Sequence, residues 1–238
     1  MFKELFVLAL SMLKGVGVSF EIFFLTLIFS LPLALLVTFG RMSHNVIIRP
    51  MIKLYLLVMR GTPLILQLIF IYFAPRYFLM FLQGSRLPEI IGSPGFWAVL
   101  RTILSYNRFT AVIIAFTLNY AAYFAEIYRG GIESISRGQY EAAKVLGFTG
   151  TQTFGRIIFP QVVKRILPAT GNEVITLVKD TALAQVIGVV ELFHAARAAA
   201  NREFSTTPIF VAGLFYLIMN WVVTVAFARF EKRLSYYA

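Results

Sequence analysis

The chain of 238 residues contains no cysteine and only two histidines, His44 and His194. Without cysteine, neither a disulfide framework nor a thiolate metal site can form. Two histidines so far apart in the sequence are too few for a metal site built on imidazole ligands. The sequence also lacks the Gly-x-x-x-x-Gly-Lys-Ser/Thr phosphate loop, so this chain cannot hydrolyse ATP by that route.

Charged residues are scarce as well, at 14% of the chain, against roughly 25% in ordinary soluble domains. Apolar residues make up 59%, phenylalanine occurs 24 times and the mean hydropathy is +0.78. A soluble domain of this length could not bury so much apolar surface, so the composition predicts a lipid-embedded protein. The net charge of +11 does not indicate a nucleic-acid partner, because lysine and arginine are interleaved with apolar spans.

Five segments are long and apolar enough to cross about 30 Å of hydrocarbon, which predicts an all-α integral membrane fold. They cover residues 16–39, 63–82, 109–128, 172–193 and 208–230. Residues 1–15 are expected to form an interfacial helix on the membrane surface, and residues 231–238 a cytoplasmic tail. No cleavable signal peptide is expected, because the first apolar run is short and Lys14 interrupts it.

The second span is preceded by residues 51–60, which also have a helical pattern. Thr62 is a candidate N-cap for this span, with Pro63 at its first helical position. If the two helical segments are continuous, Pro63 is instead expected to kink the helix.

Lysine and arginine are distributed unevenly between the two sides that these spans define. Thirteen lie in residues 41–60, in residues 129–171 and around the C-terminal tail, and eight lie on the opposite side. Because cytoplasmic loops carry the excess of these residues, we expect the N-terminus outside and the C-terminus inside the cell. The outer loop 83–107 is rich in glycine and proline and is expected to be irregular, with one short helix.

The inner loop 129–171 has the pattern of two short helices. The first is expected near residues 139–146 and ends at Gly147, since glycine tolerates the left-handed conformation that closes a helix. The sequence Thr149-x-x-Gln152 is a capping box that opens a second helix, expected to end before Pro160. Two such helices could lie across the membrane surface and present a face to a partner, or could form an ordinary solvated loop.

Polar side chains inside the spans indicate a pathway, because ionisable groups in lipid usually face a cavity or a partner. In the fourth span, Glu173, Asp180 and Glu191 would fall within roughly 20° of one line along a continuous helix. Other candidates are Thr176 on the same face, Gln67 in the second span, and Asn119, Tyr123 and Glu126 on one face of the third span. The carboxylates would suit the ammonium group of an amino acid.

Simpler roles for these residues remain open. Glu173 and Glu191 lie near span ends, where solvent can reach them. Asp180 could pair with Lys179, Arg129 or another cation, and Asn119 could only bridge helices.

Five segments, in order, resemble the integral-membrane permease subunits of bacterial polar amino-acid ABC importers of the histidine/glutamine permease type. They are residues 60–64 (Arg-Gly-Thr-Pro-Leu), 125–132 (Ala-Glu-Ile-Tyr-Arg-Gly-Gly-Ile), 138–143 (Gly-Gln-Tyr-Glu-Ala-Ala), 172–175 (Asn-Glu-Val-Ile) and 179–183 (Lys-Asp-Thr-Ala-Leu). The chain departs from the family pattern at Phe159, where leucine usually precedes Pro160, and at Ala182, where serine is frequent.

The resemblance implies a type I ABC importer permease fold in the bacterial cytoplasmic (inner) membrane, with short coupling helices. It implies four kinds of partner: ABC ATPase subunits, a second permease subunit (identical or related), an extracytoplasmic solute-binding protein, and membrane lipid. ATP and Mg would be bound by the ATPase, with no cofactor in this chain. The residues that it implies for docking on the ATPase are Gln139, Glu141, Ala142, Ala143, Gly147 and Pro160.

Two other functions are compatible with parts of the sequence. A stand-alone secondary transporter or channel would explain the polar faces but not the docking loop, and five spans suit an inverted-repeat carrier poorly. A membrane enzyme would have to work with Glu126 and Asp180 alone, since the sequence offers no histidine base near them and no cysteine nucleophile.

Overall fold

In the computed structural model, the described residues are 2–85 and 93–234, and every element in them is a helix. The α-helices are α1 (Phe2–Met42), α2 (Ile48–Gly61), α3 (Leu64–Gly84), α5 (Pro94–Leu104), α6 (Arg108–Glu133), α7 (Arg137–Val145), α8 (Gly150–Thr153), α9 (Phe159–Asp180), α10 (Leu192–Glu203) and α11 (Thr207–Leu234). A π-helical turn, η1 (Phe154–Ile158), joins α8 to α9, and a 3₁₀ segment, η2 (Thr181–Ile187), follows α9.

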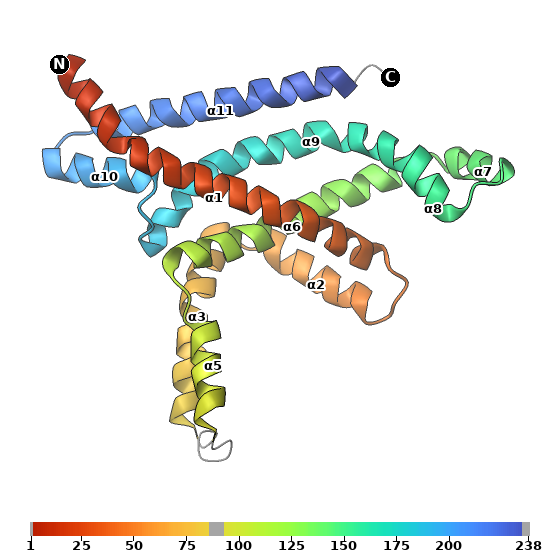
Figure 1. Cartoon of the computed structure of the whole chain (residues 1–238), viewed down its shortest axis with the longest axis horizontal. Helices are drawn as coiled ribbons and strands as arrows, with labels where there is room; N and C mark the ends of the chain where they lie inside the picture. The colour runs from red at the N-terminus through yellow and green to blue at the C-terminus, as the bar shows by residue number, and fades with distance from the viewer. Residues whose placement is uncertain (1, 86–92, 235–238) are drawn as a thin grey trace.

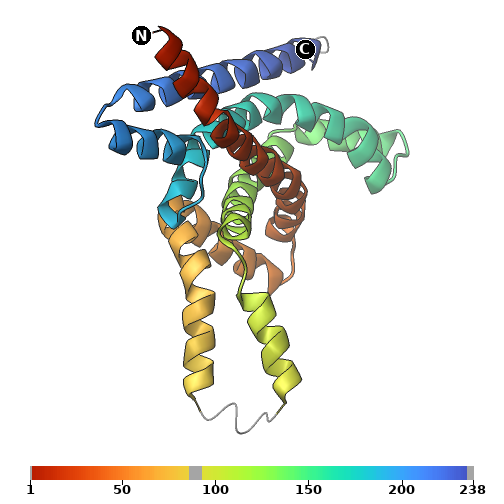
Figure 2. The ribbon, with the colours of Figure 1, turned by 60° about the vertical axis from the view of Figure 1, so that its left-hand side comes forward.

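Four long helices form the body of the molecule (Figure 1). Helices α1, α6 and α11 run in the same direction and α9 runs in the opposite one, so that the two ends of the chain lie at opposite ends of the body. Helices α3 and α5 leave this body together as an arm, and Figure 2 shows them as its two limbs. The α1–α2 turn and helices α7 and α8 lie toward the end where α11 finishes, so the segments predicted for the inner side lie together.

Helix α6 packs against α1, α3 and α9, and five of its eleven buried residues are alanines. Ala115, Ala121 and Ala122 are fully buried, which lets the neighbouring backbones approach closely. The Thr38 hydroxyl of α1 donates to the carbonyl oxygen of Ala34 on its own helix (2.7 Å) and to that of Ala125 on α6 (3.1 Å). Small residues and a shared hydroxyl therefore fix α1 against α6.

Four of the described helices are long and apolar enough to cross a membrane: α1, α3, α6 and α11. They contain the first, third and fifth predicted spans and all of the second except Pro63. Helix α9, which begins the fourth predicted span, is not among them. Its sequence includes the five charged residues Lys164, Arg165, Glu173, Lys179 and Asp180, which lower its hydropathy.

The fourth predicted span, 172–193, is also not one continuous helix. Helix α9 ends at Asp180, η2 winds more tightly to Ile187, and Gly188 takes a left-handed conformation with φ +79°. Because the 100° spacing holds only within an α-helix, the predicted alignment of Glu191 with Glu173 and Asp180 is wrong. Only Glu173 and Asp180 share a face.

The N-terminal segment 1–15 does not form a separate interfacial helix, since α1 runs unbroken from Phe2 to Met42. Gly15 lies inside α1 and allows another backbone to approach. A Cβ at this position would lie 3.0 Å from Leu192 Cα and 3.1 Å from the Glu191 carbonyl oxygen. Glycine is therefore a contact point between α1 and the start of α10, and the helix continues past it.

The expected helix at 51–60 is present as α2, and the helical conformation is interrupted between α2 and α3. Thr62 is not the N-cap of α3, because its hydroxyl donates backward to the Val58 carbonyl oxygen at 2.8 Å. Pro63 takes the N-cap position, with φ −61° and ψ 135°, and turns the chain into the arm. The expected short helix of the outer loop is α5, while residues 86–92 of that loop lie outside the described residues.

The first part of the inner loop follows the sequence pattern. Helix α7 covers the expected residues, Gly147 closes it with φ +78°, and Thr149 and Gln152 exchange both hydrogen bonds of a capping box. The second helix does not end before Pro160. The Phe159 N–H bonds to the Phe154 carbonyl oxygen in a π-helical turn, and the chain continues as α9.

Proline is tolerated at residue 160 because it lies in the first turn of α9, where a missing N–H costs little. At the other end of the chain, α11 continues to Leu234. Part of the predicted tail 231–238 is therefore helical, and residues 235–238 lie outside the described part of the chain.

Candidate functional site

A cavity of about 320 Å³ lies where the α2–α3 turn, α6 and α9 meet. Its lining is polar for a membrane helix bundle and consists of Thr62, Pro63, Leu64, Asn119, Tyr120, Tyr123, Glu173, Thr176 and Asp180. The charged side chains among these are the two carboxylates of Glu173 and Asp180. They are separated by two turns of α9, about 10.5 Å along the helix axis, and face the same side. The cavity can therefore offer negative charge at two depths.

Asp180 is held by a hydroxyl group, and no ion pair involves it within the described residues. The buried Tyr120 donates from its hydroxyl to Asp180 Oδ2 at 2.8 Å. The sequence left open a partnership with Lys179 or Arg129, and neither forms an ion pair with it in the described part of the chain. A carboxylate with one neutral donor keeps acceptor capacity for a cationic ligand.

Gln67 and Asn119 lie beside the cavity and bond to each other and to residues at the end of α2. These bonds stabilise the turn between α2 and α3. Asn119 Nδ2 donates to the Met59 carbonyl oxygen (3.0 Å) and to Gln67 Oε1 (2.9 Å). Gln67 Nε2 donates to the same Met59 oxygen (2.9 Å) and to Thr62 Oγ1 (2.8 Å). Gln67 is thus not a lining residue, whereas Asn119 both bridges helices and borders the cavity.

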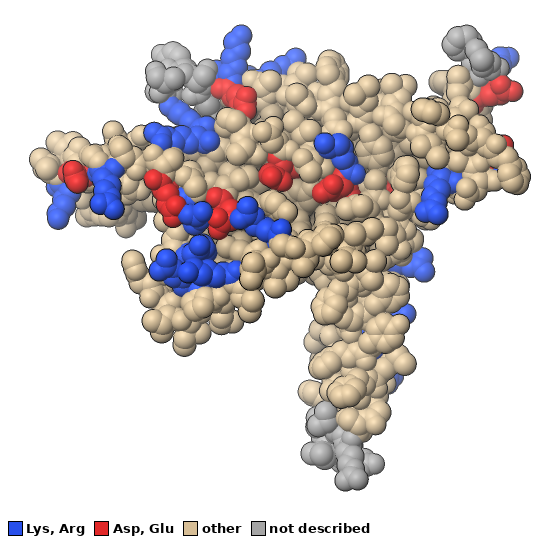
Figure 3. Space-filling view, turned by 180° about the vertical axis from the view of Figure 1, so that it is seen from behind, with Lys and Arg blue, Asp and Glu red and all other residues tan. Residues whose placement is uncertain are grey.

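Glu126 does not reach this cavity, although Asn119 and Tyr123 on the same face of α6 do. Its Oε2 accepts from Arg129 Nη2 at 2.8 Å, and Arg41 and Arg60 approach it to 3.7 Å. The Arg60 guanidinium also lies 5.5 Å from the centre of the Tyr123 ring. Glu126 therefore belongs to a cluster of arginines beside the cavity. Figure 3 shows basic and acidic side chains gathered at this end of the body, while the arm is nearly uncharged.

Glu191 is fully buried and its carboxylate is the N-cap of α10. Its two oxygens accept from the Phe193 N–H (2.7 Å), the His194 N–H (2.8 Å) and the Tyr216 hydroxyl (2.9 Å). The carboxylate is thus neither solvated, as one expectation had it, nor part of the cavity. It joins α10 to α11 at the point where Gly15 of α1 also touches the chain.

The predicted docking residues gather around α7, at one tip of the molecule (Figure 1). Gln139, Glu141, Ala142, Gly147 and Pro160 are exposed, whereas Ala143 is buried against the molecule. Two apolar side chains beside them, Val145 and Leu146, are 87% and 73% exposed. Gln161 Nε2 donates to Gln139 Oε1 at 3.3 Å, which connects α7 to the first turn of α9.

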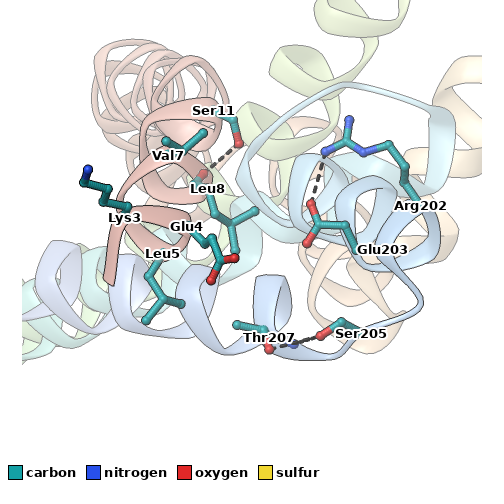
Figure 4. A pocket seen from close by; sticks show the side chains of 10 residues that line it. All are labelled: Lys3, Glu4, Leu5, Val7, Leu8, Ser11, Arg202, Glu203, Ser205 and Thr207. Atoms are coloured by element: carbon teal, nitrogen blue, oxygen red, sulfur yellow. Dashed lines mark hydrogen bonds and ion pairs between the residues drawn. The ribbon is translucent and has the colours of Figure 1, made fainter. Parts of the chain in front are cut away.

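A larger cavity, of about 670 Å³, lies between the start of α1, the end of α10 and the start of α11 (Figure 4). Its charges include Arg202 and Glu203, which form an ion pair at 3.3 Å. None of the predicted pathway residues lines it. The cavity of about 320 Å³ is the better candidate site, because five predicted side chains line it, two of α6 and three of α9, including the carboxylates of Glu173 and Asp180.

Sequence reasoning missed two kinds of residue at the site. Tyr120 follows Asn119 directly and precedes Tyr123 by three residues, so helical spacing places it near the polar face of α6. Thr62 and Leu64 flank a proline that was read as part of a helix, and only the break at Pro63 brings them to the cavity.

The family model for binding-protein-dependent transport system inner membrane components matches residues 30–236. The nopaline transport system permease protein NocM of Agrobacterium fabrum is 34% identical over 214 residues, covering 90% of this chain and 83% of the relative. The histidine/lysine/arginine/ornithine transport system permease protein HisM of Escherichia coli is 34% identical over 222 residues, covering 92% of this chain and 87% of the relative.

Solved structures agree with these sequence matches. A crystal structure of an amino acid ABC transporter with histidines superposes with a TM-score of 0.80 at 28% identity, over 98% of both chains. The inward-facing MetNI methionine ABC transporter shares the fold, with a TM-score of 0.65 at 17% identity, over 98% of this chain and 99% of the other. The resemblance inferred from the five sequence segments and the type I importer fold are therefore confirmed.

Proposed function

Because the chain belongs to the family of binding-protein-dependent transport system inner membrane components, we propose that it imports a polar amino acid as one subunit of an ATP-driven transporter. The observation that carries this proposal is the cavity between α6 and α9, with Glu173 and Asp180 as its charged lining. A site of this size suits a small solute, and its carboxylates match the ammonium group that every amino acid carries.

The substrate class follows from the charge of the lining. Two carboxylates favour an amino acid with a cationic side chain, whose second positive charge would pair with the second carboxylate. Three relatives are named as permeases for such compounds: nopaline, arginine, and histidine with lysine, arginine and ornithine. A substrate with two positive charges is therefore the first to try.

The energy would come from ABC ATPase subunits that bind ATP and Mg and dock at α7. The helical run from α8 through η1 and α9 connects this docking tip to Asp180 without an intervening loop. A push on α7 would thus shift the cavity carboxylates against α6. Residues 146–149 separate α7 from this run, and the Gln161–Gln139 hydrogen bond links α7 to the first turn of α9. The run and this link support coupling between ATPase closure and the opening of the site to one side of the membrane.

The remaining partners and the orientation complete the proposal. A second permease subunit, identical or related, would close the cavity on its open side, and an extracytoplasmic solute-binding protein would deliver the amino acid. Since the basic loops lie at one end of the body, that end would face the cytoplasm, with the N-terminus outside.

A pull-down of the chain from its native membrane in mild detergent tests the docking step. The Glu141→Ala/Gly147→Asp variant alters an exposed face of α7 and places a side chain where φ is +78°. We expect the ATPase to be recovered with the native chain and lost with the variant, at equal membrane abundance. An Arg101→Gln variant in α5, on the arm, should retain it. If neither chain retains an ATPase, a stand-alone secondary transporter or channel becomes the better explanation.

A further inference from the structure

A third cavity, of about 450 Å³, lies between the ends of α1 and α2 and the side of α6. It is lined by Arg41, Lys53, Leu56, Leu57, Arg60, Gly61 and Glu126. Three of the charged side chains are cations and one is an anion. The cavity therefore has an excess of positive charge that the chain itself does not neutralise.

The single carboxylate of this cavity, that of Glu126, is already bonded to an arginine of this chain. Arg129 bonds to Glu126 Oε2 through Nη2 (2.8 Å) and Nε (3.1 Å), and it also pairs with Glu133. Arg41 and Arg60 stay at 3.7 Å from Glu126, beyond hydrogen-bond distance. Lys53 makes no ion pair with any described residue. Donors of three side chains are thus available to one oxyanion, and a phosphate has the oxygens to accept from all of them.

The surface beside these cations is apolar. Met51, Leu54, Leu57 and Val58 of α2 are between 45% and 70% exposed. They follow a helical spacing that puts them on neighbouring faces of α2, and Leu57 also lines the cavity. A free phosphate would use the cations alone, whereas a phospholipid would use both the cations and this apolar strip.

We propose that this cavity binds the phosphate headgroup of an anionic phospholipid, whose acyl chains lie along the exposed face of α2. Basic pockets between membrane helices are known to suit such headgroups. The proposal requires only that the helices lie in a bilayer, and it does not depend on which solute the protein carries. It also assigns a use to Lys53 and to the apolar face of α2, which the transport site leaves unexplained.

Native mass spectrometry of the assembled transporter, taken from nanodiscs of phosphatidylglycerol and phosphatidylcholine in equal amounts, tests this site. The wild-type complex should retain phosphatidylglycerol preferentially. The Arg41→Gln/Lys53→Gln variant should lower that preference by roughly 25-fold, at about fivefold for each cation removed. An Arg41→Lys/Lys53→Arg variant keeps both charges and should restore it, which separates loss of charge from misfolding.

Two controls decide the outcome. The Arg229→Gln/Arg233→Gln variant removes the same charge from the end of α11 and should keep the preference. If it loses as much as the first variant, or if the first variant loses nothing, the site is overturned. Inorganic phosphate at millimolar concentration should not displace the retained lipid. Displacement by phosphate would show a site for soluble anions and would contradict the lipid assignment.

Discussion

Two carboxylates that the sequence placed on one helix face have opposite surroundings in the structure. Asp180, at the end of α9, is half-buried at a cavity and accepts one hydrogen bond from a described residue, the one from Tyr120. Glu191, eleven residues later, is fully buried and accepts from two backbone N–H groups and the Tyr216 hydroxyl. Both carboxylate oxygens of Glu191 are engaged in hydrogen bonds, whereas the Asp180 carboxylate can accept further hydrogen bonds from a ligand.

From this difference we expect Glu191 to serve the fold and Asp180 to serve a ligand. When protein donors occupy the acceptor sites of a carboxylate, it stabilises the helices that supply those donors. No acceptor site then remains for a solute. A carboxylate at a cavity with one donor is costly in lipid unless something binds there. Substitutions at the two positions should therefore separate into a loss of stability and a loss of transport.

The largest effect is expected from Glu191→Ala. The change leaves three donors without an acceptor and removes the N-cap of α10, so the free energy of unfolding should fall by about 3 kcal/mol or more. Thermal unfolding of the purified complex measures it, with Glu203→Ala on the exposed end of the same helix as the control. Equal unfolding temperatures for the two variants would show that the buried cap does not stabilise the fold.

Asp180→Asn should leave the fold intact and impair uptake. Asparagine keeps the size of the side chain and an acceptor for Tyr120, but it removes one of the two carboxylates that line the cavity. We expect uptake of a cationic amino acid to fall about tenfold or more, equivalent to about 1.4 kcal/mol or more. Uptake by Glu203→Gln at matched membrane abundance is the control, and equal uptake by both variants would contradict a role for Asp180 in the pathway.

Tyr120→Phe should have the smallest effect of the three. It removes one hydrogen bond to Asp180 while keeping the ring in its buried position between helices. The loss of a typical hydrogen bond, about 0.5–1.5 kcal/mol, corresponds to roughly a two- to tenfold change in uptake. A double variant with Asp180→Asn should lose less than the sum of the two single losses, because the Tyr120 bond acts through Asp180, and fully additive losses would show that the two groups act independently.

The sequence predicted most of this architecture where local rules apply. Gly147 and the Thr149–Gln152 capping box depend only on neighbouring residues, and both are present as expected. Four of the five spans could be predicted because their apolar runs exceed the membrane thickness. Three predicted side chains of one α9 face and two of α6 reach the cavity because both helices are regular over those residues.

The failures occur where the helix geometry changes along the chain or where a distant contact decides the local structure. Helix α9 ends at Asp180, where the chain winds more tightly into η2 and then turns at Gly188. The spacing of 100° per residue therefore cannot be extended from Asp180 to Glu191. Gly15 resembles a helix stop in the sequence, but its role is to admit the backbone of residues 191–192. Neither the turn at Gly188 nor the contact at Gly15 leaves a periodic signal in the sequence.

The cavity between α6 and α9 is the path that we propose for the amino acid. Because the chain contains no cysteine, Thr176→Cys introduces a single thiol into its lining. The measurement is labelling of this thiol by a small maleimide in the assembled transporter, together with ATP-dependent uptake of arginine. We predict that labelling blocks uptake and that arginine slows the labelling. Full uptake by the completely labelled protein would contradict the assignment of this cavity.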